Sequence, residues 1–329
     1  MPRKAVQPRM TEPACRHRKG QRTSRPGGLT TPAAWRYPGA MSVEPLPNAI
    51  GATRFAAVRA RLEAAAPEWG LPAFIYEFLL FGFKQGWACL FGALVLALLL
   101  ATHLWWPPHA PVARYDVLTV AALLIQITML AFRLETLDEA KVILAFHIVG
   151  TVMELFKTAH GSWIYAEPGL LRIGQVPLFS GFMYAAVGSY LARVWRIFDF
   201  RFSGYPRRRA TVALAIAIYV NFFAHHWLPD IRLGLFAATA ILFARSWVHY
   251  RPFRVHRKMP LLLGFLLVAL FIWFAENIGT FARAWTYPHQ KDGWHAVPIA
   301  KLGAWYLLMI ISFVLVERVH GARVPDMDG

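Results

Sequence analysis

Long apolar stretches separated by short polar segments make up most of the chain after residue 70. Eight of these stretches have about the 20 residues that a helix needs to cross the hydrocarbon core of a bilayer. They are residues 86–106, 115–132, 139–157, 178–198, 210–228, 231–249, 259–281 and 300–318. The stretch at 231–249 fits this pattern least well, because it carries Arg232 and Arg245. The pattern predicts an all-α fold, a polytopic transmembrane helical bundle of about eight spans.

The segments that flank the apolar stretches have a different character. Residues 1–50 form a basic tail rich in Arg and Pro, and this composition predicts disorder. The tail has no apolar core of the kind found in a secretory signal, and Met41 is a second position at which translation could begin. Residues 51–76 are expected to form an amphipathic surface segment, in which Pro67 ends a short basic helix. Residues 321–329 form a C-terminal tail.

One polar signature, Glu-x3-Thr-x4-Trp-x-Tyr, occurs twice along the chain, and a Val-Pro pair follows each copy. The first copy consists of Glu154, Thr158, Trp163 and Tyr165, and the second of Glu276, Thr280, Trp285 and Tyr287. The offset of 122 residues also carries His103, Trp105 and Pro107 onto His225, Trp227 and Pro229. Similarity at a fixed offset indicates an internal duplication, with one four-span half at 77–198 and another at 199–320. Duplicated membrane proteins tend to place their sites where the halves meet.

The positive charge of the apolar region is concentrated in a few loops. The chain is 57% hydrophobic and 16% charged, with a formal net charge of +17. A strong positive charge occurs in nucleic-acid-binding proteins, but here the arginines gather in the loops at 193–209 and 245–258, between predicted spans. Such loops face the cytoplasm and attract anionic headgroups. We therefore expect membrane lipids and not nucleic acid as partners. The protein is expected to be a multi-pass protein of the bacterial cytoplasmic (inner) membrane, with both termini cytoplasmic and both signatures outside.

Glu154 and Glu276 are the candidates for catalytic residues. Each lies on an apolar span, where an ionisable side chain costs about 2.5–3.5 kcal/mol or more near the helix centre and rarely faces lipid. Glu154 has Lys157 one turn further along, whereas no basic residue lies within one turn before Glu276. Both carboxyls are therefore expected to point into the bundle. They would serve either as structural groups that fix helix packing or as paired acids for proton transfer or cation handling.

Polar and aromatic residues around the two glutamates are candidates for substrate binding. They are Thr158, Trp163, Tyr165, Asn277, Thr280, Trp285 and Tyr287. The loops that carry the two Trp-x-Tyr pairs contain Gly and Pro, which disfavour a helix, so they could form lids over a cavity between the halves. In the simpler alternative, their aromatic side chains anchor the loops at the level of the lipid headgroups.

A metal site would combine the same glutamates with two histidines. His103 and His225 end the first and fifth predicted spans, and with Glu154 and Glu276 they would supply imidazole and carboxylate ligands. No close ligand spacing such as His-x3-His supports this set, so the sequence favours no metal. The two cysteines, one in the tail and one in a span, match neither a disulfide nor a metal motif. The sequence indicates neither a cofactor nor an oligomeric state.

Several long motifs are similar to those of a known family. They are Arg133-Leu-Glu-Thr-Leu-Asp-Glu-Ala-Lys-Val, Glu154-Leu-Phe-Lys-Thr, Gly161-Ser-Trp-Ile-Tyr, Val176-Pro-Leu-Phe-Ser-Gly-Phe-Met-Tyr-Ala-Ala-Val-Gly-Ser-Tyr, and the stretch from Met259 to Thr280. Over residues 70–320 the chain resembles the bacterial integral-membrane family catalogued as domain of unknown function 817. This resemblance implies a membrane fold and no particular activity.

A shorter pattern resembles a second group of proteins. A span ending in Glu, an aromatic loop and a Val-Pro pair that opens the next span look like the membrane carotenoid hydratases and small lycopene cyclases. This resemblance implies a polytopic enzyme that protonates polyene double bonds with acidic side chains. One hypothesis is therefore an acid–base enzyme acting on a lipid or isoprenoid, with Glu276 as the acid and Glu154 as a base or cation stabiliser. A proton- or cation-coupled transporter and a non-catalytic membrane scaffold remain open alternatives.

Overall fold

Helices make up most of the computed structural model, which describes residues 66, 67, 69–107 and 109–322. Four helices are long and apolar enough to cross a membrane: α4 (Arg114–Ala131), α5 (Leu137–Ala159), α9 (Leu261–Phe281) and α10 (Ala300–His320). A fifth span results if α2 (Gly70–Ala88) and α3 (Leu90–Trp105), which meet at an angle of 67°, cross together. The chain is therefore a mostly helical, multi-pass membrane protein with four or five candidate spans.

Three further helices lie at predicted spans but are not among these candidates. They are α6 (Phe179–Ile197), α7 (Arg208–Ala224) and α8 (Arg232–Phe243). α8 has 12 residues and is therefore about 18 Å long, which is too short for a hydrocarbon core of about 30 Å. α6 carries Arg193 and Arg196 in its last turns, which lowers its hydropathy. The prediction of eight spans is thus confirmed only as a multi-pass helical bundle.

The start of the helical region also differs from the prediction. The helix begins at Gly70, so residues 70–76 of the predicted surface segment belong to α2. The predicted first span is broken at Cys89, between α2 and α3, where no proline or glycine marks a break. The basic tail with Met41, most of the segment before Gly70 and residues 323–329 lie outside the described residues.

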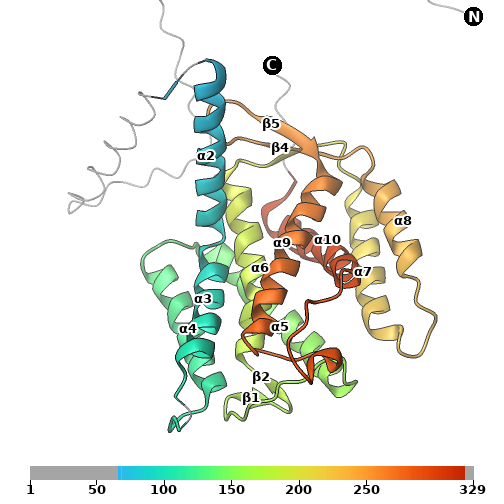
Figure 1. The fold of residues 1–329 in the computed structure, drawn as a ribbon. Helices are drawn as coiled ribbons and strands as arrows, with labels where there is room; N and C mark the ends of the chain where they lie inside the picture. The colour runs from blue at the N-terminus through green and yellow to red at the C-terminus, as the bar shows by residue number, and fades with distance from the viewer. Residues whose placement is uncertain (1–65, 68, 108, 323–329) are drawn as a thin grey trace, which may run out of the picture. The chain divides into compact units, whose positions relative to one another are not determined.

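Two small antiparallel sheets modify the predicted all-α class. β3 (Arg201–Ser203), β4 (Trp247–Tyr250) and β5 (Arg257–Pro260) form one sheet in the order β3-β4-β5, with Phe202 opposite Val248. β1 (Arg172–Ile173) and β2 (Val176–Pro177) form a hairpin at the opposite end of the bundle (Figure 1). The three-stranded sheet joins the two basic loops, so both lie at one end. The hairpin and both signature loops lie at the other.

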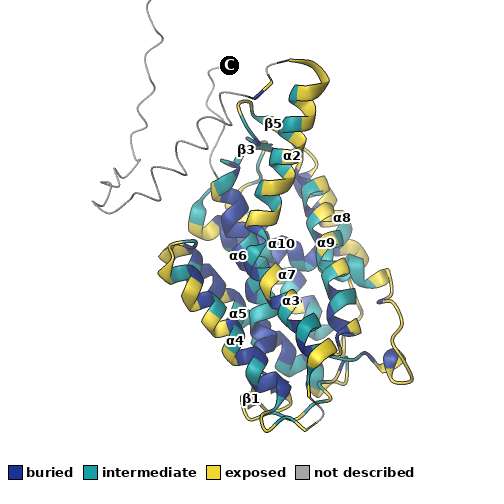
Figure 2. Ribbon diagram, turned by 60° about the vertical axis from the view of Figure 1, so that its left-hand side comes forward, coloured by how far each residue is buried: buried dark blue, intermediate teal, exposed yellow. Residues whose placement is uncertain are grey.

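α6 is the central helix of the bundle. It packs against α2, α3, α4, α5 and α10, and Figure 2 shows that α6 is largely buried while α2 is largely exposed. The largest apolar core surrounds α6, α7, α9 and α10 and contains Trp195, Phe243, Phe265 and Phe313. Large apolar side chains such as Phe271 on α9 are exposed on the outside of the bundle, as expected where helices face lipid.

Candidate functional site

Polar contacts at the start of α5 hold this helix against α6. Thr136 caps α5: its hydroxyl accepts the backbone N–H of Glu139, and the Glu139 carboxylate accepts the N–H of Thr136. The same carboxylate accepts from Nε of Arg196 on α6 at 2.9 Å, and Glu135 accepts from Ser189 of α6 at 2.6 Å. These bonds fix the face of α5 that points into the bundle, and that face carries Glu154.

Glu154 is buried near the end of α5, with 3% of its surface exposed. Its Oε2 accepts the indole N–H of Trp163 at 2.7 Å and the hydroxyl of Tyr165 at 2.8 Å. Its Oε1 accepts the hydroxyl of Tyr184, on α6, at 2.7 Å. Three donors therefore satisfy this carboxyl in the interior, where an unpaired one would be very costly.

Glu276 occupies a similar environment on α9, with 4% of its surface exposed. Its Oε1 accepts the hydroxyl of Tyr287, and its Oε2 accepts the indole N–H of Trp305, on α10, at 2.6 Å. Each glutamate thus accepts from one indole and from the tyrosine of its own signature.

Tyr165 and Tyr287 lie in the loops and remain neutral. Burial raises the pKa of both phenols well above the usual range, and the neighbouring carboxyl group acts in the same direction. At physiological pH both hydroxyls therefore keep their protons and can donate to the glutamates.

Direct contacts join the two signature loops. Ile164 and Thr286 exchange backbone hydrogen bonds of 3.0 and 2.9 Å in an antiparallel bridge. The rings of Trp163 and Tyr287 meet edge to face, with their centroids 6.0 Å apart. The Lys301 ammonium lies 4.4 Å from the Tyr287 centroid and 5.4 Å from that of Trp163, within the range of a cation–π interaction. Both glutamates therefore belong to one cluster.

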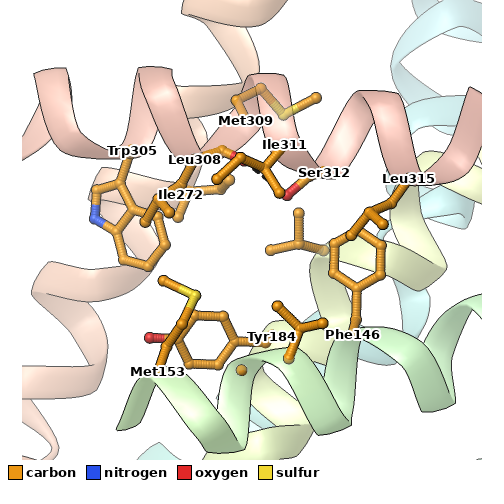
Figure 3. A pocket seen from close by; sticks show the side chains of 13 residues that line it. Phe146, Met153, Tyr184, Ile272, Trp305, Leu308, Met309, Ile311, Ser312 and Leu315 are labelled. Carbon is orange, nitrogen blue, oxygen red and sulfur yellow. Dashed lines mark hydrogen bonds between the residues drawn. The ribbon is translucent and has the colours of Figure 1, made fainter. Parts of the chain in front are cut away.

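A narrow cleft between α5, α6, α9 and α10 ends at this cluster. Its cavity volume is about 30 Å³, and most lining side chains are apolar, among them Met153, Leu308 and Leu315. Figure 3 shows that the Tyr184 hydroxyl and the Trp305 indole nitrogen point toward the same end of the cleft. There they donate to Glu154 and Glu276, respectively. The site thus combines a narrow apolar cleft with two buried carboxyls behind aromatic side chains.

The pattern of the family described as "Protein of unknown function (DUF817)" matches residues 77–313, more than half of the chain. The chain belongs to the DUF817 family. A curated relative, uncharacterized protein YoaT of Bacillus subtilis (strain 168), is 46% identical over 243 residues. The alignment covers 74% of this chain and 91% of the relative. The resemblance noted in the sequence is thereby confirmed, and the family remains one of unknown function.

Two solved structures show a partial likeness to this DUF817 protein. The mycobacterial Insig homolog MvINS from Mycobacterium vanbaalenii has a TM-score of 0.40 and 14% identity, and the match covers 58% of this chain and 98% of that one. A cross-linked trimer of MvINS has a TM-score of 0.41 and 16% identity, with coverages of 59% and 98%.

In this DUF817 protein, four of the predicted substrate-binding residues support backbone and loops. Thr158 donates to the carbonyl of Glu154 at 2.7 Å, and Asn277 accepts the N–H of Val297, just before α10, at 2.9 Å. Thr280 accepts the indole N–H of Trp294 at 3.2 Å. The ring of Trp285 packs on Gly279, where an added Cβ would lie 2.5 Å from the ring. The other three, Trp163, Tyr165 and Tyr287, donate to the glutamates.

The structure does not assemble the alternative metal set. Residues 66–322, apart from 68 and 108, hold no group of three or more His, Cys, Asp or Glu side chains placed to bind a metal. His103 packs on the ring of Phe281, with centroids 5.6 Å apart. His225 contacts Nζ of Lys157 at 3.4 Å, so this lysine extends toward α7. His103, His225, Glu154 and Glu276 therefore do not converge.

Tyr184, Trp305 and Lys301 are site residues that sequence reasoning missed. Tyr184 lies on α6, a helix rich in small residues of the kind that lets neighbouring helices pack closely. Trp305 lies on an apolar stretch. A signal was present, because Tyr184 and Trp305 follow their glutamates at nearly the same distance along the chain, on the helix after each signature.

Proposed function

We propose that this protein performs acid–base chemistry on a lipid-soluble substrate, such as an isoprenoid, within the membrane. The observation that carries this proposal is the apolar cleft that ends at Tyr184 and Trp305, which donate to two different buried glutamates. An apolar lining suits a hydrocarbon chain, and a few convergent polar groups suit its reactive end. A carboxyl group positioned at that end can act as a general acid or base.

The aromatic side chains at the end of the cleft support the isoprenoid as a substrate class. Protonation of a carbon–carbon double bond creates positive charge, which aromatic ring faces stabilise. The rings of Tyr184 and Trp305 lie next to each other, with centroids 6.5 Å apart. They would flank the charge as it develops.

Proton- or cation-coupled transport is a second candidate, and it depends on the proposed duplication into halves 77–198 and 199–320. Ile164 and Thr286, which form the bridge between the loops, are separated by the 122-residue offset. The two glutamates, one from each half, would then lie near a pseudo-two-fold axis, where transport sites often occur. A membrane scaffold in which both glutamates are structural is the third possibility.

The enzyme proposal predicts a chemical change in extracted lipids. A Bacillus subtilis strain lacking its YoaT relative would be complemented with wild-type protein, Glu154→Gln or Glu276→Gln, and the lipids compared by mass spectrometry. Only the wild type should yield a lipid that differs from its precursor by an acid–base reaction, because glutamine keeps the shape of the side chain but transfers no proton. Unchanged lipids whose distribution across the membrane differs would favour transport. Equal profiles in all strains would favour a scaffold.

We also propose that both termini and the three-stranded sheet face the cytoplasm and that the signature loops face outward. In a background without the native cysteines, Asp292→Cys should react with an impermeant thiol reagent in intact cells. Val255→Cys, between β4 and β5 and 58% exposed, should react only after permeabilisation. The reason is that basic loops are retained on the cytoplasmic side. The reverse labelling pattern would contradict this orientation.

A further inference from the structure

Each of the two buried carboxyls has one oxygen beside an indole, a group that cannot accept a proton. An indole N–H donates a hydrogen bond and cannot accept one. Oε2 of Glu154 accepts from Trp163 at 2.7 Å, and Oε2 of Glu276 accepts from Trp305 at 2.6 Å. Oε2 of Glu154 also accepts the Tyr165 hydroxyl at 2.8 Å, so two donors already occupy that oxygen. In both glutamates Oε1, which faces a phenol alone, is therefore the better position for an exchangeable proton.

The two Oε1 atoms face different parts of the protein. Oε1 of Glu154 lies 2.7 Å from the hydroxyl of Tyr184, and Oε1 of Glu276 contacts the hydroxyl of Tyr287. A phenol can accept one proton while it donates another. Tyr184 lines the cleft, whereas Tyr287 lies in the loop before α10 beneath the Lys301 ammonium. The exchangeable proton of Glu154 is thus directed at the cleft, and that of Glu276 at the loops.

We propose that Tyr184 transfers a proton to the ligand in the cleft and that Glu154 is the acid that replaces it. This inference rests on the proposed function and differs from the sequence hypothesis, in which Glu276 is the acid. The hydroxyl proton of Tyr184 forms a bond to one carbon of a ligand double bond, while the proton on Oε1 of Glu154 moves to the Tyr184 oxygen. The ligand gains one positive charge, Tyr184 stays neutral, and Glu154 becomes a carboxylate.

The product state of this transfer matches the hydrogen bonds present at Glu154. A carboxylate only accepts hydrogen bonds, and Trp163, Tyr165 and Tyr184 together offer three donors to its two oxygens. Donors already oriented toward the charge that develops lower the barrier to a proton transfer, because they need no reorganisation. Trp163 and Tyr165 are therefore positioning residues for Glu154.

The cleft also restricts the ligand. Its lining on α10 runs from Trp305 to Leu315, which corresponds to about 15 Å of helix. The side chains beyond the aromatic end are apolar except for Ser312, whose hydroxyl donates to its own helix at Leu308. The ligand class that suits this apolar lining is an unsaturated hydrocarbon chain with its reactive double bond at the end lined by Tyr184. Because the cavity volume is only about 30 Å³, such a chain would have to displace lining side chains as it binds.

Two conservative variants test the relay. Tyr184→Phe and Tyr165→Phe each remove one phenol bonded to Glu154, at 2.7 and 2.8 Å, but only Tyr184 lines the cleft. In the complemented Bacillus subtilis strain, Tyr184→Phe should reduce formation of the product lipid by about 100-fold or more. Tyr165→Phe should reduce it by about tenfold at most, the effect of one hydrogen bond. Equal losses would overturn the proposal, because Tyr184 would then serve only to position Glu154.

Infrared spectroscopy gives a readout that needs no substrate. In the purified full-length protein, the carbonyl stretch of protonated Glu154 can be assigned as the band that Glu154→Gln removes during a pH titration. That band should move to higher frequency in Tyr184→Phe and stay in place in Tyr287→Phe. An unchanged band in Tyr184→Phe would overturn the proton placement. Absence of a product lipid in the wild type would remove the proposed function and the transfer step, while a band shift confined to Tyr184→Phe would still support the placement.

Discussion

Glu154→Leu is expected to abolish or severely reduce recovery of folded protein. The substitution leaves three buried donors, on Trp163, Tyr165 and Tyr184, without their acceptor. Each unsatisfied buried donor costs about 1–3 kcal/mol, so the loss approaches the whole stability of an ordinary domain, about 5–15 kcal/mol. The yield of monodisperse protein and its unfolding temperature in detergent measure the effect.

Glu154→Gln is the matched control for this prediction. The glutamine carbonyl can accept from Trp163 and Tyr165, and its amide can donate to Tyr184 if that hydroxyl turns to accept. We therefore expect Glu154→Gln to fold with a loss of at most about 2 kcal/mol. If Glu154→Leu proved as stable as Glu154→Gln, the carboxyl would not be the acceptor that holds these side chains.

Arg114→Met is expected to lower the unfolding temperature by about 6–12 °C. Arg114 is 5% exposed and joins three parts of the chain: it donates to Thr102 at 3.2 Å, to Glu167 at 2.6 Å and to the carbonyl of Ala282 at 2.7 Å. Removing one partner of a buried ion pair costs about 3–5 kcal/mol, and we take about 3 because Glu167 is partly exposed. In a protein of this size, 1 kcal/mol shifts the unfolding temperature by about 2–4 °C.

Two further variants separate the causes of this loss. Arg114→Lys keeps the charge, but its single ammonium cannot reach all three acceptors as the planar guanidinium does. It should therefore recover only part of the stability. Arg172→Met removes an exposed arginine from the β1–β2 hairpin and should change the unfolding temperature little. If Arg172→Met lowered the unfolding temperature as much as Arg114→Met, the loss would be due to the change in net charge and not to the buried contacts.

The sequence located the candidate site through energetic cost and repetition. Glu154 and Glu276 are conspicuous because carboxyls on apolar spans must find partners, and the repeated Trp-x-Tyr pattern pointed to Tyr165 and Tyr287. Tyr184 and Trp305 carried no comparable signal, since aromatic residues on membrane helices are common and need no polar partner. Their role arises only because α6 and α10 bring them against helices from elsewhere in the chain.

The elements of the fold were likewise predictable where a local pattern determines them, and not predictable where long-range packing does. Apolar length predicted α4, α5, α9 and α10, because twenty apolar residues have few alternatives in a bilayer. The break at Cys89 was not predictable from a local pattern, because apolar residues flank it on both sides. The three-stranded sheet pairs Phe202 with Val248 across more than forty residues of chain, and three-residue or four-residue strands in basic loops give no periodic signal.

Contacts between the proposed halves at both ends of the bundle restrict the motion of one half against the other. The backbone bridge between Ile164 and Thr286 joins the proposed halves at one end of the bundle. At the other end, the Arg257 guanidinium of β5 donates to the Glu77 carboxylate of α2 at 2.5 Å. A rocking motion of one proposed half against the other would have to rupture contacts at both extremities in every cycle. Bracing of this kind disfavours a transport cycle that depends on such a rocking motion.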